Sequence, residues 1–352
     1  MFLLPFRFLK IYAFLLNYIS VKCPIGEMIK VLAATVTAFS TILIPAIVAS
    51  WLLSLTIRTH FGGVVVTPKR LLTAFAVPCI FAIRELRRKS LSLSGIVAAF
   101  YVGFVLTISN VGFITCLLVF FYTSSKLTKF RAVRKAKQDS GQEPTRNWMN
   151  VLNNGGVPTG LALLYILEVG CMDTPVNFSD PRYYTSSWLS VAILASIACA
   201  CGDTWASEFG SAVGPSTSML ITSGKRVPAG TNGGVSVLGT LASMSGGAVI
   251  GVTFMITNYV ARDSQSLQWS LAVLGFWSGF FGSTLDSFLG ATMQYSGFDE
   301  DAKKVVGTPG PGVKHISGVN FLNNHAVNFI SCFTTALLSP MLYAYLVNAM
   351  VP

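Results

Sequence analysis

Three short polar segments interrupt otherwise apolar stretches of the chain, and they contain carboxylates, hydroxyls and glycines. These segments cover residues 202–208, 222–236 and 282–287. The first contains Asp203 and Glu208, and the third contains Asp286. Hard oxygen ligands of this type suit Mg²⁺, which completes its coordination shell with water and substrate phosphates. We therefore interpret these three carboxylates as candidate metal ligands and catalytic residues.

The second segment is rich in glycine and begins with basic side chains. Lys225 and Arg226 precede a loop made of Gly230, Thr231, Asn232, Gly233 and Gly234, directly before a long apolar run. Glycines allow backbone N–H groups to converge on an anion, a helix N-terminus adds a favourable dipole, and the basic side chains supply positive charge. This pattern predicts a phosphate site, although it is not a Walker A motif. A glycine-rich turn in which Thr231 or Asn232 caps the next helix is the structural alternative.

The carboxylate segments also have structural interpretations. Asp203 would be an N-cap if a short re-entrant helix began there, whereas a helix that continues past Gly202 would place Asp203 and Ser207 on one face. In the third segment, small residues precede Asp286 at helical spacing, namely Gly275, Gly279 and Gly282. Small residues let helices approach closely. We expect this face to be a packed interface that ends at a buried carboxylate.

The composition places these segments in a membrane protein. The chain of 352 residues is 52% hydrophobic and only 11% charged, whereas a soluble domain carries about 25% charged residues. A membrane helix needs about 20 apolar residues. Uncharged runs of this length lie at residues 31–57, 90–125, 183–202, 235–261, 264–285 and 326–352. We predict an all-α polytopic membrane bundle of about 8 to 10 transmembrane helices, with the long run at 90–125 divided into two helices at residues 109–112.

The charged residues predict the orientation. Basic loops at residues 84–89 and 126–137 are expected in the cytoplasm, where loops carry an excess of Lys and Arg. The acidic loop at residues 171–186 is then luminal, and its sequon makes Asn177 a candidate N-glycosylation site. Following the helices from these loops brings all three polar segments to the cytoplasmic face. Residues 58–70 hold three Lys and Arg residues on the luminal side and depart from the rule, so the topology of residues 57–83 stays open.

We divide the chain into an apolar segment, residues 1–30, and a single polytopic membrane domain, residues 31–352. The first segment contains Arg7 and Lys10 and is consistent with a span, an interfacial helix or a signal-like segment. The net charge of +11 fits cytoplasmic loops that face anionic lipid, so no nucleic-acid partner is expected. The seven cysteines form no CxxC pair and the three histidines are dispersed, so neither residue type suggests a metal site.

Taken together, the motifs resemble the transmembrane protein 19 family, which includes plant and bacterial phytyl-phosphate kinases. The motifs are Gly202-Asp203-Thr204 with Ser207-Glu208, the stretch at 227–236, and Asp286-Ser287-Phe288-Leu289-Gly290-Ala291 with Gln294. The resemblance covers roughly residues 90–348. The spacing is also distantly similar to dolichol kinase and CDP-diacylglycerol synthase, in which comparable segments contribute to a nucleotide and metal site.

This resemblance implies a CTP-dependent kinase that converts an isoprenoid alcohol monophosphate to the diphosphate, in the endoplasmic reticulum or another endomembrane. It implies that Asp203, Glu208 and Asp286 hold Mg²⁺ or Mn²⁺. It also implies that CTP phosphates are held by Lys225, Arg226, Gly230, Thr231, Asn232, Gly233, Gly234 and Ser287. The partners are then a nucleotide and a membrane lipid or isoprenoid phosphate, whose prenyl tail lies between helices at the lipid boundary.

Two other functions stay open from the sequence. A transporter or channel would also place carboxylates and broken helices in the membrane, and a catalytically inactive relative would bind nucleotide or lipid phosphate without turnover. Two asparagine-rich segments, 147–154 and 323–325, are interpreted as helix caps or as part of a ligand site. The basic run at 126–137 is interpreted as a topology and lipid-contact signal.

Overall fold

The structure is a computed structural model that describes residues 51–52, 66–88, 90–135, 146–213, 217–261 and 267–350. The predictions for the segment 1–30, for most of the run at 31–57 and for residues 58–65 lie outside these residues. The chain divides into two compact units, Met1–Leu72 and Thr73–Pro352. Helix α4 (Pro68–Arg88) begins just before this boundary, and the packing and the site discussed below belong to the second unit.

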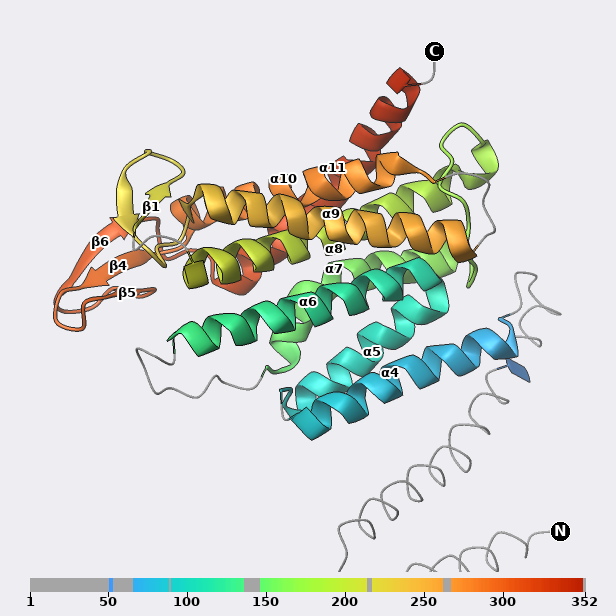
Figure 1. Ribbon diagram of the computed structural model, residues 1–352, viewed down its shortest axis with the longest axis horizontal. Helices are drawn as coiled ribbons and strands as arrows, with labels where there is room; N and C mark the ends of the chain where they lie inside the picture. The colour runs from blue at the N-terminus through green and yellow to red at the C-terminus, as the bar shows by residue number, and fades with distance from the viewer. Residues whose placement is uncertain are drawn as a thin grey trace, which may run out of the picture. The chain divides into compact units, whose positions relative to one another are not determined.

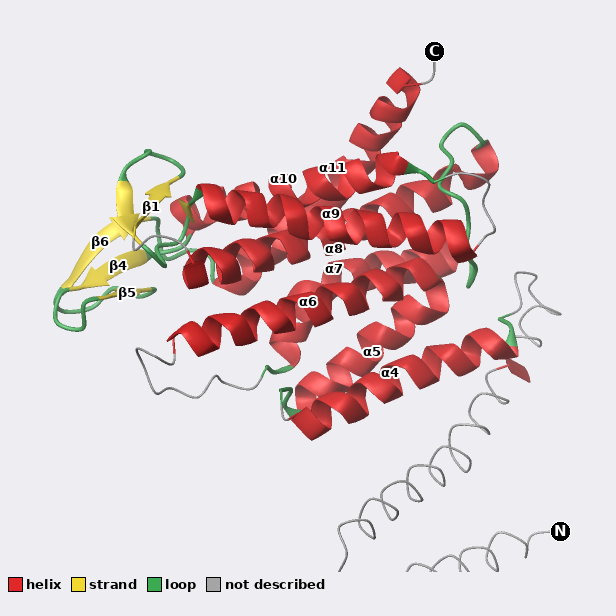
Figure 2. Ribbon diagram, viewed as in Figure 1, coloured by secondary structure: helices red, strands yellow, loops and turns green. Residues whose placement is uncertain are grey.

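Eight helices make up most of the described part of the chain, and small sheets join some of their ends (Figures 1 and 2). The helices are α4 (Pro68–Arg88), α5 (Leu93–Ser109), α6 (Val111–Lys135), α7 (Trp148–Glu168), α8 (Tyr184–Val213), α9 (Val237–Ala261), α10 (Trp269–Met293) and α11 (Asn324–Met350). Four of these, α6, α8, α9 and α11, contain stretches long and apolar enough to cross a membrane, and α5 is a shorter apolar helix. The predicted all-α membrane bundle is therefore confirmed.

The predicted division of the run at 90–125 is also confirmed. Helix α5 ends at Ser109, and Asn110 adopts an extended conformation before α6 begins at Val111. The Asn110 side chain accepts a hydrogen bond from the Gly112 N–H at 2.7 Å. Such a local side-chain bond satisfies a free N–H group at the start of a helix, which is why asparagine is favoured there.

Helix α8 is the central helix and packs against α6, α7, α9, α10 and α11. Between Ser186 and Gly202 almost all of its side chains are buried. A helix that is apolar on every side must be covered on every side. The helix continues past Gly202 to Val213, so Asp203 lies within a helix and is not the N-cap of a re-entrant one.

Glycines set the spacing between α8, α9 and α10. A Cβ atom added at Gly202 of α8 would lie 2.7 Å from the Gly279 Cα of α10, and one added at Gly247 of α9 would lie 2.8 Å from the same atom. Gly275 faces Gly247 and Gly251, and Gly282 faces Cys199. The predicted packed glycine face of α10 is therefore confirmed, and it holds three helices at backbone contact distance.

Small antiparallel sheets, which the sequence did not predict, join helix ends. One sheet has the order β2-β1-β3 and connects α8 to α9; its strands are β1 (Thr217–Leu220), β2 (Arg226–Pro228) and β3 (Gly234–Val235). The other has the order β5-β4-β6 and connects α10 to α11; its strands are β4 (Ser296–Asp299), β5 (Lys304–Val306) and β6 (Val313–Ser317). The first sheet follows the end of α8, and the second follows the end of α10. Both sheets lie at the same end of the bundle (Figure 2).

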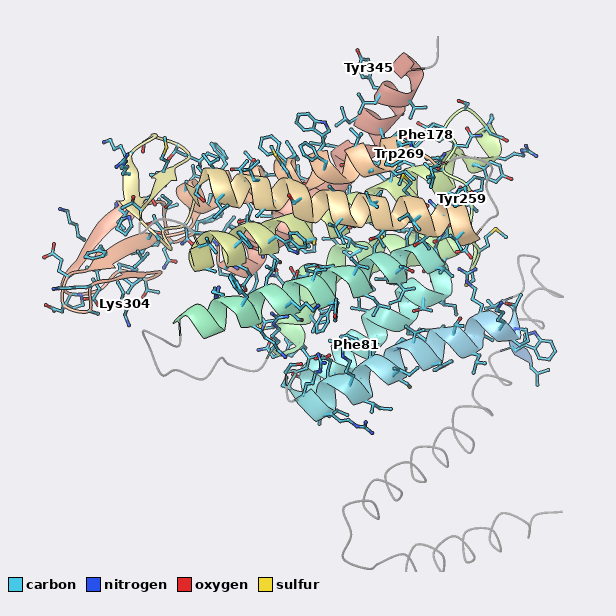
Figure 3. All side chains as sticks on the ribbon, viewed as in Figure 1. Phe81, Phe178, Tyr259, Trp269, Lys304 and Tyr345 are labelled. Carbon is cyan, nitrogen blue, oxygen red and sulfur yellow. The ribbon has the colours of Figure 1, made fainter. Side chains whose placement is uncertain are left out.

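The opposite end of the bundle carries aromatic side chains. Tyr259 near the end of α9, Trp269 at the start of α10 and Phe178 in the α7–α8 loop lie far from Lys304 of β5 (Figure 3). Tyr259 and Trp269 are exposed. Tyr and Trp are enriched where a membrane meets water. This end therefore suits one membrane interface, and the end with the sheets suits the other.

Candidate functional site

A cavity of about 690 Å³ lies at the sheet end of the bundle. Asp203 and Glu208 of α8, Asp286 and Ser287 of α10, and the loop at 230–234 all line it. The structure thus brings the three polar segments together, as the sequence predicted. The described helices α4 to α11 each contribute lining residues.

Asp203 and Asp286 face the cavity from neighbouring helices. The Ser283 hydroxyl of α10 donates to an Asp203 oxygen at 3.3 Å, and Ser283 is one helical turn before Asp286. The two carboxylates are close enough for their charges to repel each other. Neither forms an ion pair within the described residues. Carboxylates in such a place usually face a cation or a polar ligand, so this pair is suited to a divalent ion.

Asp286 is also held by helix α11. The Ser331 hydroxyl donates to an Asp286 oxygen at 3.5 Å. With its amide oriented to suit its neighbours, Asn328 donates to the same oxygen at 3.1 Å and accepts from Asn153 of α7 at 3.1 Å. Asn328 did not emerge from the sequence. The signal for it is its place one turn after Asn324 on the same face of α11.

Glu208 has a different environment from the other two carboxylates. The Arg131 Nε lies 3.2 Å from one Glu208 oxygen, and the Thr128 hydroxyl donates to the other at 3.1 Å. No group of three or more His, Cys, Asp or Glu residues able to hold a metal ion occurs among the residues that the structure describes. The three-carboxylate metal set expected from the sequence is therefore not assembled. Asp203 and Asp286 remain as the pair that fits Mg²⁺, because Glu208 is already neutralised by Arg131.

Two arginines line the cavity, Arg131 of α6 and Arg146 at the start of α7. The sequence assigned the basic run at 126–137 to topology and lipid contact, but Arg131 of this run lines the cavity and pairs with Glu208. The Arg146 guanidinium donates to the Thr128 hydroxyl at 3.0 Å. No spacing rule in the sequence identifies these arginines, since helix packing alone brings α6, α7 and α8 together around Glu208.

Lys225 and Arg226, the predicted phosphate-binding residues, are exposed and do not line the cavity. Strand pairing gives the physical reason. Val227 of β2 is buried against the sheet, so its neighbour Arg226 must point to the opposite face. Lys225 lies in the turn between β1 and β2. Positive charge at the cavity comes instead from Arg146, because the charge of Arg131 is paired with Glu208.

The loop at 230–234 lines the cavity, but several of its N–H groups already have protein partners. The Thr231 N–H donates to Pro228, the Gly234 N–H to Thr231, and the Asn232 N–H to the Ser296 hydroxyl at 3.0 Å. Gly233 has a φ of +78°, and a Cβ there would lie 2.6 Å from the Ser287 carbonyl oxygen of α10. The loop is thus anchored to α10 and β4 and forms a rigid wall, with little backbone left free to cradle an anion.

The N-terminus of α9 opens on the same cavity. The residue that caps it is Ser236, whose hydroxyl accepts from the Gly239 N–H at 3.1 Å. The sequence had offered Thr231 or Asn232 for this role, and both are too far from the helix start. Ser236, Gly239 and Thr240 all line the cavity, so the positive end of the α9 dipole faces a ligand bound there.

The asparagine-rich segments contribute both caps and cavity residues. Asn147 caps α7 by accepting from the Asn150 N–H at 3.2 Å, and Asn323 accepts from the Ala326 N–H at 2.9 Å at the start of α11. The cap interpretation is therefore confirmed for Asn147 and Asn323, whereas a role in ligand binding stays a prediction for the residues that line the cavity. The members that line the cavity are Asn150, Asn153, Asn154 and Asn324.

Apart from Ser124, Thr128 and Arg131 near the end of α6, the residues of α4, α5 and α6 that line the cavity are apolar. These apolar residues are Val77, Pro78 and Phe81 of α4, Ala99, Val102 and Gly103 of α5, and Ile114, Leu117, Leu118, Phe120 and Phe121 of α6. Ligand sites commonly combine an apolar lining with a few polar groups that fix orientation. This cavity is therefore shaped for a ligand that has both a charged part and an apolar part.

Asn177 lies at the other end of the bundle, in the loop between α7 and α8. Asn177 is exposed, and its side-chain oxygen accepts a hydrogen bond from the Ser179 N–H at 3.0 Å. The sequon is thus accessible, and the α7–α8 loop that carries it lies at the end of the bundle opposite the sheets (Figure 1). Its modification remains a prediction.

Comparison with known proteins gives a family but no solved fold. A sequence profile described as "Integral membrane protein DUF92" matches residues 76–336. Protein PGR of Arabidopsis thaliana is 39% identical over 286 residues, which cover 79% of this chain and 97% of that protein. An uncharacterized membrane protein of Methanocaldococcus jannaschii is 25% identical over 278 residues, covering 79% of this chain and 96% of that protein. No solved structure matches.

Proposed function

The chain belongs to the DUF92 family of integral membrane proteins, and we propose that its cavity is the active site of a membrane-embedded phosphotransferase. The reaction transfers the terminal phosphoryl group of CTP to an isoprenoid alcohol monophosphate. The observation that carries the proposal is the content of one cavity. A carboxylate pair that forms no ion pair with the described residues, two arginines and an apolar wall all line it.

The proposed reaction needs positioning and charge neutralisation more than a protein base. An oxygen of the acceptor phosphate attacks the γ-phosphorus of CTP, the bond to the β-phosphate oxygen breaks, and CDP leaves. A phosphate monoester is already largely ionised at neutral pH because its second pKa is about 6, so its oxygen needs no proton acceptor. Phosphoryl transfer of this kind depends mainly on holding the two groups in line.

The residues of this chain divide into three roles. Asp203 and Asp286 would hold Mg²⁺, which when bound neutralises charge on the transferring phosphates. Arg146 adds positive charge at the other side of the polar lining, beside the Arg131–Glu208 ion pair, and the N-terminus of α9 adds its dipole. The loop at 230–234 closes one wall and limits the entry of water, which would otherwise compete with the acceptor.

The orientation supports access to a soluble nucleotide. The basic residues 84–88 and 126–135, which the sequence assigned to loops, form the C-terminal ends of α4 and α6, at the end of the bundle that holds the cavity. Positive loops mark the cytoplasmic side of a membrane protein. We propose that the cavity faces the cytoplasm from the endoplasmic reticulum or another endomembrane, where it would meet CTP.

The test is a phosphotransfer assay with purified protein, Mg²⁺, CTP labelled at the γ-phosphate, and phytyl or geranylgeranyl monophosphate. We expect labelled diphosphate from the wild type, and a loss of about 100-fold or more in Asp203→Asn and Asp286→Asn. Asp301→Asn, an exposed carboxylate outside the cavity lining, is the matched control. Full turnover in Asp203→Asn would exclude the metal role, and CTP binding without product would indicate an inactive binding protein.

A further inference from the structure

Arg146 is held rigidly at the edge of the cavity. Its backbone forms a parallel bridge with Leu91, its N–H donates to the Ser90 carbonyl at 3.2 Å, and its carbonyl accepts from the Ser92 N–H at 2.9 Å. These bonds tie the start of α7 to the start of α5. Its side chain therefore projects from a fixed backbone, which is how precise binding groups are usually supported.

The guanidinium of Arg146 has unused hydrogen-bonding capacity. Within the described residues its one side-chain partner is the Thr128 hydroxyl, and it forms no ion pair. A guanidinium carries several N–H donors in a planar fork, and that fork matches the oxygens of a phosphate. The neighbouring Glu208 is already occupied by Thr128 and Arg131. Arg146 is thus a partly buried cation that lines the cavity and forms no ion pair with the residues that the structure describes.

Helix α6 connects this cation to the apolar wall. Leu117, Phe121, Ser124, Thr128 and Arg131 all line the cavity, and their spacing places them on one face of the helix. Along that face the lining changes from apolar to hydroxyl to cationic. At 1.5 Å per residue, Leu117 and Thr128 are about 16 Å apart along the helix axis. A ligand lying along α6 would meet apolar side chains first and Arg146 at its end.

The carboxylate pair belongs to a different wall. Asp203 and Asp286 are on α8 and α10 and lie beside the α9 N-terminus and the loop at 230–234. A phosphate bound directly between these two carboxylates would be repelled unless a divalent ion lay between them. A metal-bound nucleotide therefore suits the side of the cavity with Asp203 and Asp286. An anion that carries an apolar chain suits the side with Arg146 and α6.

From this arrangement we propose that Arg146 binds the phosphate of the acceptor, and that the apolar chain of the acceptor lies along α6. This inference rests on the proposed function, because it names the acceptor side of the same site. Thr128 is a positioning residue, since it holds the Arg146 guanidinium, and the Arg131–Glu208 pair completes the support around Thr128.

The experiment measures binding rather than turnover, by titration calorimetry of the purified full chain in detergent. The probes are geranylgeranyl monophosphate, geranylgeraniol, inorganic phosphate and CTP with Mg²⁺. We expect the wild type to bind the monophosphate about 10- to 100-fold more tightly than the alcohol. Arg146→Gln is expected to reduce this preference to a few-fold while the affinities for the alcohol and for CTP stay unchanged. Lys304→Gln, an exposed lysine of β5 (Figure 3), is expected to keep the full preference.

Each outcome decides the proposal. Equal binding of alcohol and monophosphate by the wild type would overturn it, and so would an undiminished preference in Arg146→Gln. A loss of CTP affinity alone would place Arg146 in the nucleotide site instead. If inorganic phosphate bound as tightly as geranylgeranyl monophosphate, the apolar chain of the ligand would make no contribution to binding. If Arg146→Gln does not fold, Arg146→Lys keeps the charge without the fork and must still weaken the preference. An intact preference without phosphotransfer would reject the proposed function and leave the role of Arg146 standing.

Discussion

The Arg131 Nε lies 3.2 Å from an oxygen of Glu208, so a carboxylate that the sequence offered as a metal ligand already faces a cation. The Glu208 side chain is 11% exposed and the Arg131 side chain is 30% exposed. A charge in such a position is tolerated only when it is paired, and removal of one partner leaves the other with an uncompensated cost. The relationship therefore assigns Glu208 to stability and to the positioning of Arg131.

Glu208→Gln tests this assignment. We expect the free energy of unfolding in detergent to fall by about 1–3 kcal/mol, because Arg131 loses its counter-charge. Binding of Mn²⁺, followed by electron paramagnetic resonance, is expected to stay intact because Asp203 and Asp286 are unchanged. In a double-mutant cycle with Arg131→Gln, the two effects should be coupled rather than additive. A stable Glu208→Gln variant that no longer binds Mn²⁺ would return Glu208 to the metal site.

The close crossing of α9 and α10 should make the protein sensitive to a side chain at Gly279. A side chain at Gly279 would meet the Ser243 carbonyl and would lie 2.8 Å from the Gly247 Cα, so Gly279→Ala should force the helices apart. We expect a loss of about 1–3 kcal/mol in stability, measured by thermal unfolding. Gly160 of α7 has open space around it and is the matched control. Gly160→Ala should be neutral or stabilising by up to about 1 kcal/mol. Equal effects of the two changes would refute the close crossing.

Some of this site was predictable from local sequence and some was not. The division of the run at 90–125 followed from the turn residues at 109–112, and the three polar segments stood out because charged residues are rare beside apolar runs. Arg131, Arg146 and Asn328 escaped because their role depends on which helices pack together, and no local pattern encodes that. Lys225 and Arg226 were placed wrongly because the pairing of β1 with β2, which decides where their side chains point, was not foreseen.

The loop at 230–234 should be sensitive to a single methyl group. Gly233 and Gly224 both have positive φ, so alanine costs about 1–2 kcal/mol of backbone strain at either position. Only at Gly233 would the new Cβ also meet α10, 2.6 Å from the Ser287 carbonyl oxygen. We therefore expect Gly233→Ala to lower stability and CTP affinity clearly more than Gly224→Ala. Thermal unfolding and calorimetric titration with CTP measure the two effects, and matching losses would show that the loop is not pressed against α10.

The exposed pair Lys225 and Arg226 should matter little for nucleotide binding. Both side chains lie outside the cavity lining, and the attraction of exposed charges is weakened by salt. The combined change Lys225→Gln with Arg226→Gln is expected to alter CTP affinity by less than about threefold at physiological ionic strength. Titration of the wild type and the variant side by side measures this. A tenfold or greater loss would show that the β1–β2 turn closes over the nucleotide.

The last expectation concerns orientation, on which access to CTP depends. If the cavity faces the cytoplasm, Asn177 lies in the lumen, and its exposed side chain should accept an N-linked glycan. Expression in cells should then give a band that shifts on treatment with a glycosidase, and Asn177→Gln should remove the shift. A second sequon, made at the cavity end by Val306→Asn ahead of Thr308, should remain unmodified in the Asn177→Gln background. A glycan at position 306 with none at 177 would invert the topology, and a cytoplasmic nucleotide could then no longer reach Asp203 and Asp286.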